Sequence, residues 1–220
     1  MRLRTARVIC VASAVLVLAP TAALAAAGDP QQKHTSAGTL QATSALVRVG
    51  DLGAGWKSSR SNGGQLECDA VLQPNESDLI EAGKAVGPLF TSGMEAVTQN
   101  VHVFATEAQA NIAWKRALTN KLVLCMEQQV ENLSSMGSPV SVTEWHRLAL
   151  PRSDARVTEF RVVAKAKTAK TTWSKVYFDQ ILLGRAKTMT RIVFSSLRAP
   201  VSKTLEQKLA SVVANRMAGA

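Results

Sequence analysis

The chain is poor in residues that carry chemistry by themselves. Its 220 residues include three cysteines, three histidines and one tyrosine, and aromatic residues make up only 5%. His34, His102 and His146 are scattered without the spacing of metal ligands. Gly-x-Ser-x-Gly, His-Glu-x-x-His and glycine-rich phosphate-binding motifs, which mark hydrolases, metalloproteases and nucleotide-binding proteins, are missing. We therefore expect no cofactor, no metal site and no enzymatic activity.

Long apolar runs are also missing, apart from one at the N-terminus. Three arginines precede an apolar run over residues 8–18, and the small-residue stretch 22–25 follows it. This order is typical of a secretory signal peptide, residues 1–25, cleaved before Ala26. The run is shorter than the roughly 20 residues of a transmembrane helix. We expect a secreted protein, extracellular or associated with the cell envelope, with no transmembrane anchor after cleavage.

Acidic residues are scarce in the second half of the chain. The whole sequence has 26 basic and 16 acidic residues, a formal charge of +10. Residues 26–130 hold 8 basic and 10 acidic residues, whereas residues 131–220 hold 15 and 6. A basic half indicates an anionic partner, or serves only solubility. Because nucleic acid is a poor partner for an exported protein, we expect an anionic envelope lipid or polymer.

Two cysteines remain once Cys10 is removed with the signal peptide. An exported protein folds in an oxidising environment, so we predict a disulfide between Cys68 and Cys125. In the chain-entropy model a loop of this length is worth about 4 kcal/mol.

The mature chain divides into a leader and one domain. Residues 26–38 are polar and aperiodic, which predicts a flexible leader, and residues 39–220 form a single domain. Within it we expect short helices over 40–49 and 74–82. Alternating residues predict an antiparallel hairpin made of strands 87–90 and 95–104.

The second half alternates between helix and strand signals. Thr106 and Gln109 form a capping-box pattern that begins a long helix through residue 132. Four alternating runs predict an antiparallel meander with strands at 140–150, 155–166, 171–183 and 186–197. A last helix begins at Pro200 and ends near Gly219. The predicted fold is α+β: an antiparallel sheet, N-terminal hairpin plus four-stranded meander, packed against one long helix and a C-terminal helix.

Alternation along the meander separates two faces. The apolar face, expected to meet both helices, consists of Leu148, Leu150, Phe160, Val162, Val176, Phe178, Leu182, Ile192 and Phe194. The other parity carries cations between aromatic rings: Trp145, Arg147, Arg161, Lys165, Trp173, Lys175, Tyr177, Lys187 and Arg191. Such a surface stacks sugars or apolar chains and neutralises phosphate or carboxylate. We predict that these residues bind ligand; the alternative is a face that is merely solvated or covered.

Several short pieces of the sequence resemble a known family. The turn Asp51-Leu52-Gly53-Ala54-Gly55-Trp56, Cys68, the strand Val101-His102-Val103-Phe104, Ala108 and Cys125 follow the same order as in the extracellular sensor domains of actinobacterial PknH-like serine/threonine kinases and related secreted proteins. In layout the resemblance extends over residues 40–217. It implies an α+β ligand-binding fold with an antiparallel sheet, no known catalysis and an undefined ligand.

The sequence therefore favours an exported, monomeric, non-catalytic binding or sensor-like domain that recognises an anionic envelope component through the basic face. A first alternative is an extracellular module that docks another protein. A second is a hydrolase in which His146 acts as a general base with a nearby carboxylate.

Overall fold

The structure is a computed structural model that describes residues 28–60, 68–136, 139–151, 154–167 and 173–219. The predicted signal peptide lies outside these residues. The helices are α1 (Ser36–Ser44), α2 (Val49–Leu52), α3 (Glu107–Ala117), α4 (Asn120–Asn132), the 3₁₀-helix η1 (Leu133–Met136) and α5 (Lys203–Ala218). The strands are β1 (Gln31–Gln32), β2 (Lys57–Ser59), β3 (Ile80–Val86), β4 (Leu89–Ser92), β5 (Glu95–Phe104), β6 (Val140–Leu148), β7 (Arg156–Lys167), β8 (Trp173–Arg185) and β9 (Thr188–Leu197).

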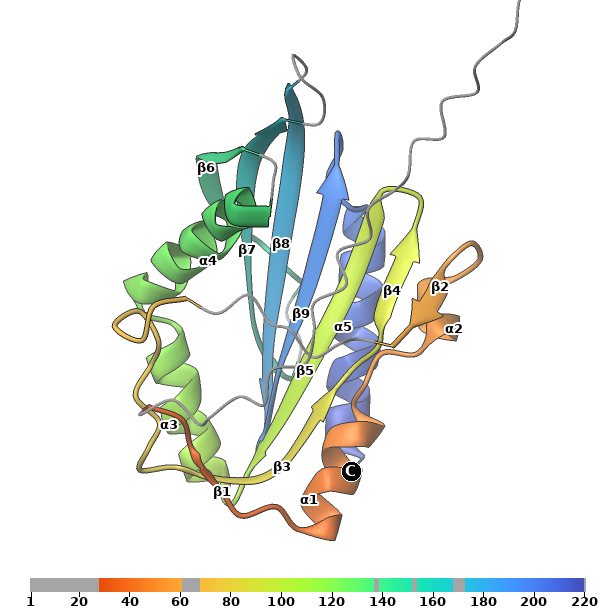
Figure 1. The fold of residues 1–220 in the computed structure, drawn as a ribbon. Helices are drawn as coiled ribbons and strands as arrows, with labels where there is room; N and C mark the ends of the chain where they lie inside the picture. The colour runs from red at the N-terminus through yellow and green to blue at the C-terminus, as the bar shows by residue number, and fades with distance from the viewer. Residues whose placement is uncertain (1–27, 61–67, 137–138, 152–153, 168–172, 220) are drawn as a thin grey trace, which may run out of the picture.

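All strands of the described chain join one nine-stranded sheet (Figure 1). Its main order is β1-β3-β5-β9-β8-β7-β6, with β4 pairing β5 and β2 pairing β4. Only β1 runs parallel to its neighbour, β3. The α+β class, the 95–104 strand and the four-stranded meander are thus confirmed. Alternation predicted the meander correctly because short connections between alternating runs favour antiparallel neighbours.

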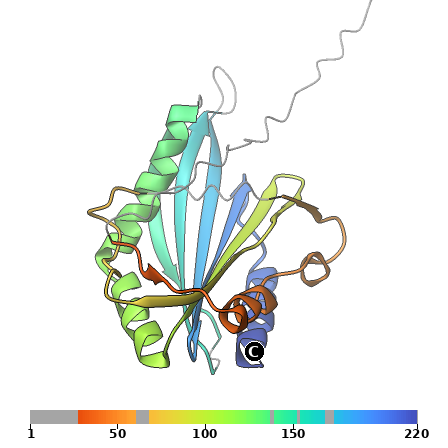
Figure 2. The same ribbon diagram turned by 60° about the horizontal axis from the view of Figure 1, so that its bottom comes forward.

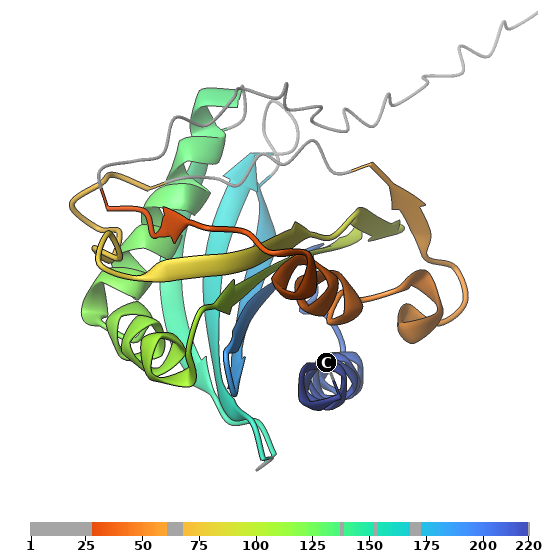
Figure 3. The ribbon, with the colours of Figure 1, turned by 90° about the horizontal axis from the view of Figure 1, so that it is seen from below.

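The sheet is covered on both faces. Figures 2 and 3 show α3 and α4 along one face, and α1 and α5 against the other. On the α5 side the buried cluster includes Val97, Val101, Ile181, Ile192, Phe194, Leu209 and Val213. On the α3–α4 side two clusters hold Phe104, Trp114, Leu182 and Met189, and Met126, Val130, Val162 and Ala164.

The prediction of a single apolar face is wrong for this reason. Phe160, Val162, Phe178 and Leu182 pack on the α3–α4 side, but Leu150, Ile192 and Phe194 belong to the α5 side. The last helix lies opposite the long one and does not share its face. A sheet buried on both faces has apolar residues of both parities, so alternation alone does not assign them to one core.

Three local predictions also differ from the structure. The segment predicted as a helix over 74–82 is a turn that leads into β3, and the predicted leader contains β1 and the first residues of α1. The predicted long helix is two helices, because α3 ends at Ala117 and Thr119, the N-cap of α4, is in extended conformation. This break lets Trp114 of α3 and Met126 of α4 contact different parts of a twisted sheet.

The start of α3 agrees with half of the predicted capping box. The Thr106 hydroxyl accepts a hydrogen bond from the Gln109 amide at 3.2 Å. The Gln109 side chain does not return to Thr106, since its Oε1 accepts the amide of Ile80 at 3.2 Å. Gln109 therefore ties α3 to the beginning of β3.

A buried group of charges fastens α5 to the sheet. Arg161 Nε lies 2.5 Å from Asp179 Oδ1, and Lys203 Nζ donates to Glu159 Oε2 and lies 3.6 Å from Glu206 Oε2. Three carboxyls thus face two cations. Burial, and then the charges of Glu159 and Asp179, raise the pKa of Glu206 to about 9. Glu206 therefore holds a proton at neutral pH.

Candidate functional site

A cavity of about 340 Å³ lies on the α3–α4 side of the sheet. Side chains of β5, β8 and β9 form its floor, and the end of α3 and the first turns of α4 form its wall. Residues 28–32 and the 68–78 segment cover it. Apolar lining comes from Leu72, Phe104, Leu122, Leu182 and Met189. Its volume lies at the lower end of the range of about 300–1,000 Å³ that is usual for small-molecule sites.

The floor carries two hydrogen-bond donors that lack partners among the described residues. Arg191 of β9 and Gln180 of β8 both line the cavity. Register pairs Arg191 with Leu182, and Gln180 lies two residues before Leu182 on β8, so the side chains of Arg191 and Gln180 both point to the α3–α4 side. Gln180 is 2% exposed, and its Nε2 has no acceptor in the described structure. Burial lowers the pKa of the Arg191 guanidinium, which nevertheless stays charged at neutral pH.

The disulfide and the neighbouring helices hold the 68–78 segment over the cavity. Cys68 and Cys125 are bonded, with their Cα atoms 5.2 Å apart, which confirms the predicted pairing. Further bonds join the segment to α3 and α4: Gln128 Nε2 to Asp69 Oδ2 (2.6 Å), Lys121 Nζ to the Val71 carbonyl (2.8 Å) and Arg116 to the Asn75 carbonyl (2.8 Å). The Glu76 amide donates to the Gly28 carbonyl at 2.6 Å, which links both parts of the cover.

Two histidines hold a buried carboxylate at the edge of the cavity. Glu81 of β3 is 1% exposed, and its oxygens lie 2.5 Å from His102 Nδ1 and 3.0 Å from His34 Nε2. Burial favours the neutral acid, but the hydrogen bond and charge of His102 and the bond from His34 outweigh it and lower the Glu81 pKa. The His34 side chain, which lies in the predicted leader, is therefore part of the folded domain.

A second carboxyl lines the cavity from its cover. Burial raises the pKa of Glu76 to about 7, even though the charge of Arg116 opposes this. Glu81, Asp29 and Asp78 add to the shift because they are negative. Glu76 thus changes its charge close to neutral pH.

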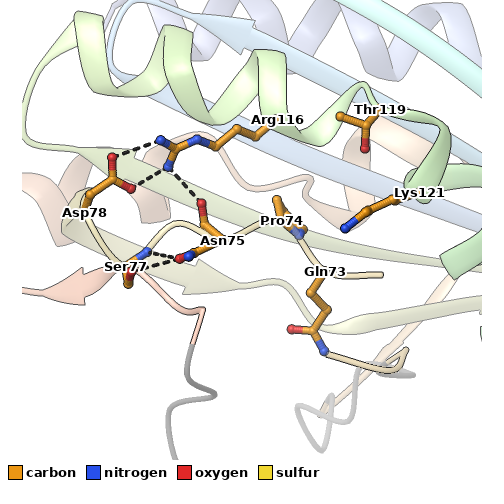
Figure 4. A pocket seen from close by; sticks show the side chains of 8 residues that line it. All are labelled: Gln73, Pro74, Asn75, Ser77, Asp78, Arg116, Thr119 and Lys121. Carbon is orange, nitrogen blue, oxygen red and sulfur yellow. Dashed lines mark hydrogen bonds and ion pairs between the residues drawn. The ribbon is translucent and has the colours of Figure 1, made fainter. Parts of the chain in front are cut away.

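An outer groove of about 450 Å³ shares Gln73, Pro74, Arg116 and Thr119 with the cavity (Figure 4). The groove contains the guanidinium of Arg116, which, unlike that of Arg191, is fully paired. Arg116 lies 2.5 Å and 2.9 Å from the two carboxylate oxygens of Asp78. The pair lowers the Asp78 pKa. The groove is therefore a less suitable anion site than the cavity floor.

The residues predicted to form one basic face do not share a face. Arg161, Lys165, Trp173, Lys175 and Tyr177 lie on the α5 side of β7 and β8. Arg191 points to the opposite side, into the cavity. Lys187 is exposed in the turn between β8 and β9.

A bulge explains why Trp145 and Arg147 also leave the predicted face. The pairing of β6 with β7 shifts by one residue between Val142 and Glu144. One extra residue turns every later side chain to the other face. Arg147 accordingly lies over the Phe160 ring on the α4 side, 5.8 Å from its centroid. Ligand binding by Trp145, Arg147 and the other residues of the predicted basic face stays a prediction.

His146 and Arg161 have partners within the described chain. His146 Nε2 lies 3.1 Å from Glu144 Oε2, and both side chains are about half exposed. Arg161 is bound to Asp179 and stacks over Tyr177 at 5.9 Å. Among the described residues, this exposed His–Glu pair is the only arrangement that supports the hydrolase alternative.

Sequence reasoning missed the cavity itself. Glu76 and Glu81, His102, and Gln180 come from three distant parts of the sequence, and only Arg191 was among the predicted site residues. The sole local signal was an arginine at a position flanked along β9 by buried Thr190 and Ile192.

Neither a membrane-spanning helix nor a metal-binding group is found in the described ranges. No helix there is long and apolar enough to cross a membrane. No group of three or more His, Cys, Asp or Glu residues in those ranges is arranged to hold a metal ion.

Comparison with known proteins finds solved structures of similar layout. No protein-family model and no curated protein matches the chain. The chain is similar to the extracellular domain of PknH from Mycobacterium tuberculosis, at 9% identity and a TM-score of 0.44, over 82% of this chain and 96% of that one. It is also similar to an uncharacterised Mycobacterium smegmatis protein, a Rv0999 ortholog, at 12% identity and a TM-score of 0.31, over 61% and 64%. Neither match carries an argument about ligand or activity.

Proposed function

We propose that this protein is an exported, non-catalytic, sensor-like binding domain that holds a small ligand in the cavity between the sheet and α3–α4. The observation that carries the proposal is the cavity floor, where Gln180 Nε2 is buried without an acceptor in the described structure and Arg191 has no carboxylate partner there. Buried polar groups are nearly always paired, so an unpaired set facing a cavity is typical of a binding site. The signal-peptide pattern and the disulfide support export.

The proposal is tested by thermal shift on purified residues 26–220 against small-molecule fractions of envelope extract. A ligand that binds only the native state raises the melting temperature. We expect a shift for the unaltered protein and for Ile112→Trp, an exposed position on α3 outside the cavity. Ala117→Trp, which fills the cavity from the same helix, should abolish it. An equal shift in both variants, or none with any fraction, contradicts the proposal.

A second candidate function is recognition of an anionic polymer by the end of β7 and the start of β8. Lys165 and Lys175 stand directly opposite each other in register, and Trp173 beside them is 50% exposed. Like charges opposite each other in a sheet are unfavourable, and a polyanion relieves this repulsion. Salt-sensitive retention on a lipoteichoic-acid or polyphosphate column, lost in Lys165→Gln/Lys175→Gln, supports this function. Retention that is unchanged in the double variant rules it out.

A further inference from the structure

The absence of a carboxylate partner separates Arg191 from the arginines of the domain that form close ion pairs. Arg116, Arg161 and Arg216 each hold a carboxylate, of Asp78, Asp179 and Asp51. The Arg191 guanidinium makes no ion pair, side-chain hydrogen bond or ring contact with any residue that the structure describes. Arg191 is partly exposed and lines the cavity, and the partial burial that lowers the pKa of its guanidinium is not offset by a nearby carboxylate in the described structure.

Such an arrangement is costly for the ligand-free protein. Partial removal of an unpaired cation from water is unfavourable, and hydrophobic residues of similar volume often stabilise a protein when they replace such a charge. The position therefore favours a partner that arrives with the ligand. Gln180 Nε2, buried beside it on the neighbouring strand without an acceptor in the described chain, supplies a second donor in the same part of the floor.

We infer that the ligand of the cavity is a small monocarboxylate with an apolar body, whose carboxylate is bound by Arg191 and Gln180. This inference rests on the proposed function. The two oxygens of a carboxylate match the planar guanidinium fork and leave a lone pair for the amide of Gln180. The apolar body lies against Phe104, Leu122 and Leu182.

Charge and size narrow the ligand class. One unpaired cation is balanced by one negative charge, and the acidic groups Glu76 and Glu81 at the edge of the cavity disfavour a dianion such as phosphate. The cavity volume of about 340 Å³ equals that of roughly a dozen water molecules at about 30 Å³ each. A short acyl or aryl acid fits this space.

The inference is tested by calorimetry with octanoate, benzoate and phenylpropionate, each beside its primary amide, and with inorganic phosphate. We expect at least one acid to bind, and to bind tighter than its amide. Arg191→Met should lower the affinity for that acid by at least about 30-fold. The same change should raise the melting temperature of the ligand-free protein by a few degrees. Arg191→Lys keeps the charge without the fork and should lose part of the affinity. Lys208→Met, which replaces an exposed cation of α5 outside the cavity, should bind as the unaltered protein does.

The outcomes separate this inference from the proposed function. If acids and amides bind alike, if phosphate binds tightest, or if Arg191→Met keeps the preference for the acid, the monocarboxylate assignment is wrong. Binding of the amides that Ala117→Trp abolishes then still supports the cavity as the binding site. If no probe binds and no envelope fraction shifts the melting temperature, both fail. A lower melting temperature of Arg191→Met also contradicts the inference, because it shows that Arg191 has a structural partner.

Discussion

At the scale of single residues, Glu206 makes the stability of the fold depend on pH. Its pKa is about 9 in the native protein and near the ordinary 4.5 when unfolded. Between these values the native state holds a proton that the unfolded chain releases, so the free energy of unfolding falls as pH rises. The slope for one such proton is at most about 1.4 kcal/mol per pH unit.

Glu206→Gln should remove this dependence, because the amide is neutral at every pH. Urea unfolding at pH 6, 7.5 and 9 should show the variant gaining stability relative to the unaltered protein as pH rises. Glu131→Gln, at an exposed position of α4, serves as the control. Parallel profiles of unfolding free energy against pH for Glu206→Gln and the unaltered protein would contradict the assignment of a neutral Glu206.

Glu76 should make carboxylate binding depend on pH, given the monocarboxylate site inferred above. Its pKa is about 7, so it is ionised at pH 8 and repels an anion in the cavity. Affinity is expected to rise as pH falls from 8 to 6, by up to about tenfold if the bound anion raises the Glu76 pKa by about one unit. Calorimetry on Glu76→Gln should give a flatter profile of affinity against pH. An unchanged profile contradicts this role.

At the scale of elements, α1 rests on β3 through two glycines. A Cβ on Gly83 would lie 2.1 Å from the backbone carbon of Gly38, and a Cβ on Gly38 would lie 2.2 Å from the carbonyl oxygen of Ala82. Both contacts are with backbone atoms, which do not move as a flexible side chain does. The close approach brings α1 near enough for Ala42 and Ala45 to be fully buried.

Gly83→Ala should therefore lower the free energy of unfolding by about 1–3 kcal/mol or more. Gly50→Ala is the matched control, because a Cβ there meets nothing within 4 Å. That change should be neutral or stabilising by about 0.4–1 kcal/mol, since it restricts only the unfolded chain. Equal unfolding midpoints for both variants in urea would show that α1 adjusts at no cost.

At the scale of the whole molecule, the disulfide joins the cover of the cavity to the helical layer. Cys68→Ser/Cys125→Ser should lose about 2–4 kcal/mol, because the bond closes a loop over a sequence separation of 57 residues. Hydrogen exchange of the 68–78 segment should become faster than that of the β7–β9 core. Reductant should lower the melting temperature of the unaltered protein and leave the double variant unchanged. A melting temperature of the unaltered protein that does not respond to reductant contradicts the disulfide.

Local patterns determined much of this protein. Alternation placed strands at 95–104 and along the meander, and Thr106 marked the start of α3 correctly. The only two cysteines outside the predicted signal peptide predicted their own pairing. These features depend on neighbours in sequence or on composition, so the sequence alone carries them.

Only the tertiary structure decided which faces are buried and where the site lies. The bulge in β6 moved Trp145 and Arg147 to the other face, and helices on both sides of the sheet made apolar residues of both parities part of the core. The cavity combines residues from β3, β5, β8, β9 and the 68–78 segment. Nothing in the sequence near Arg191 shows that its charge has no partner in the described fold, because burial and pairing are properties of distant segments brought together.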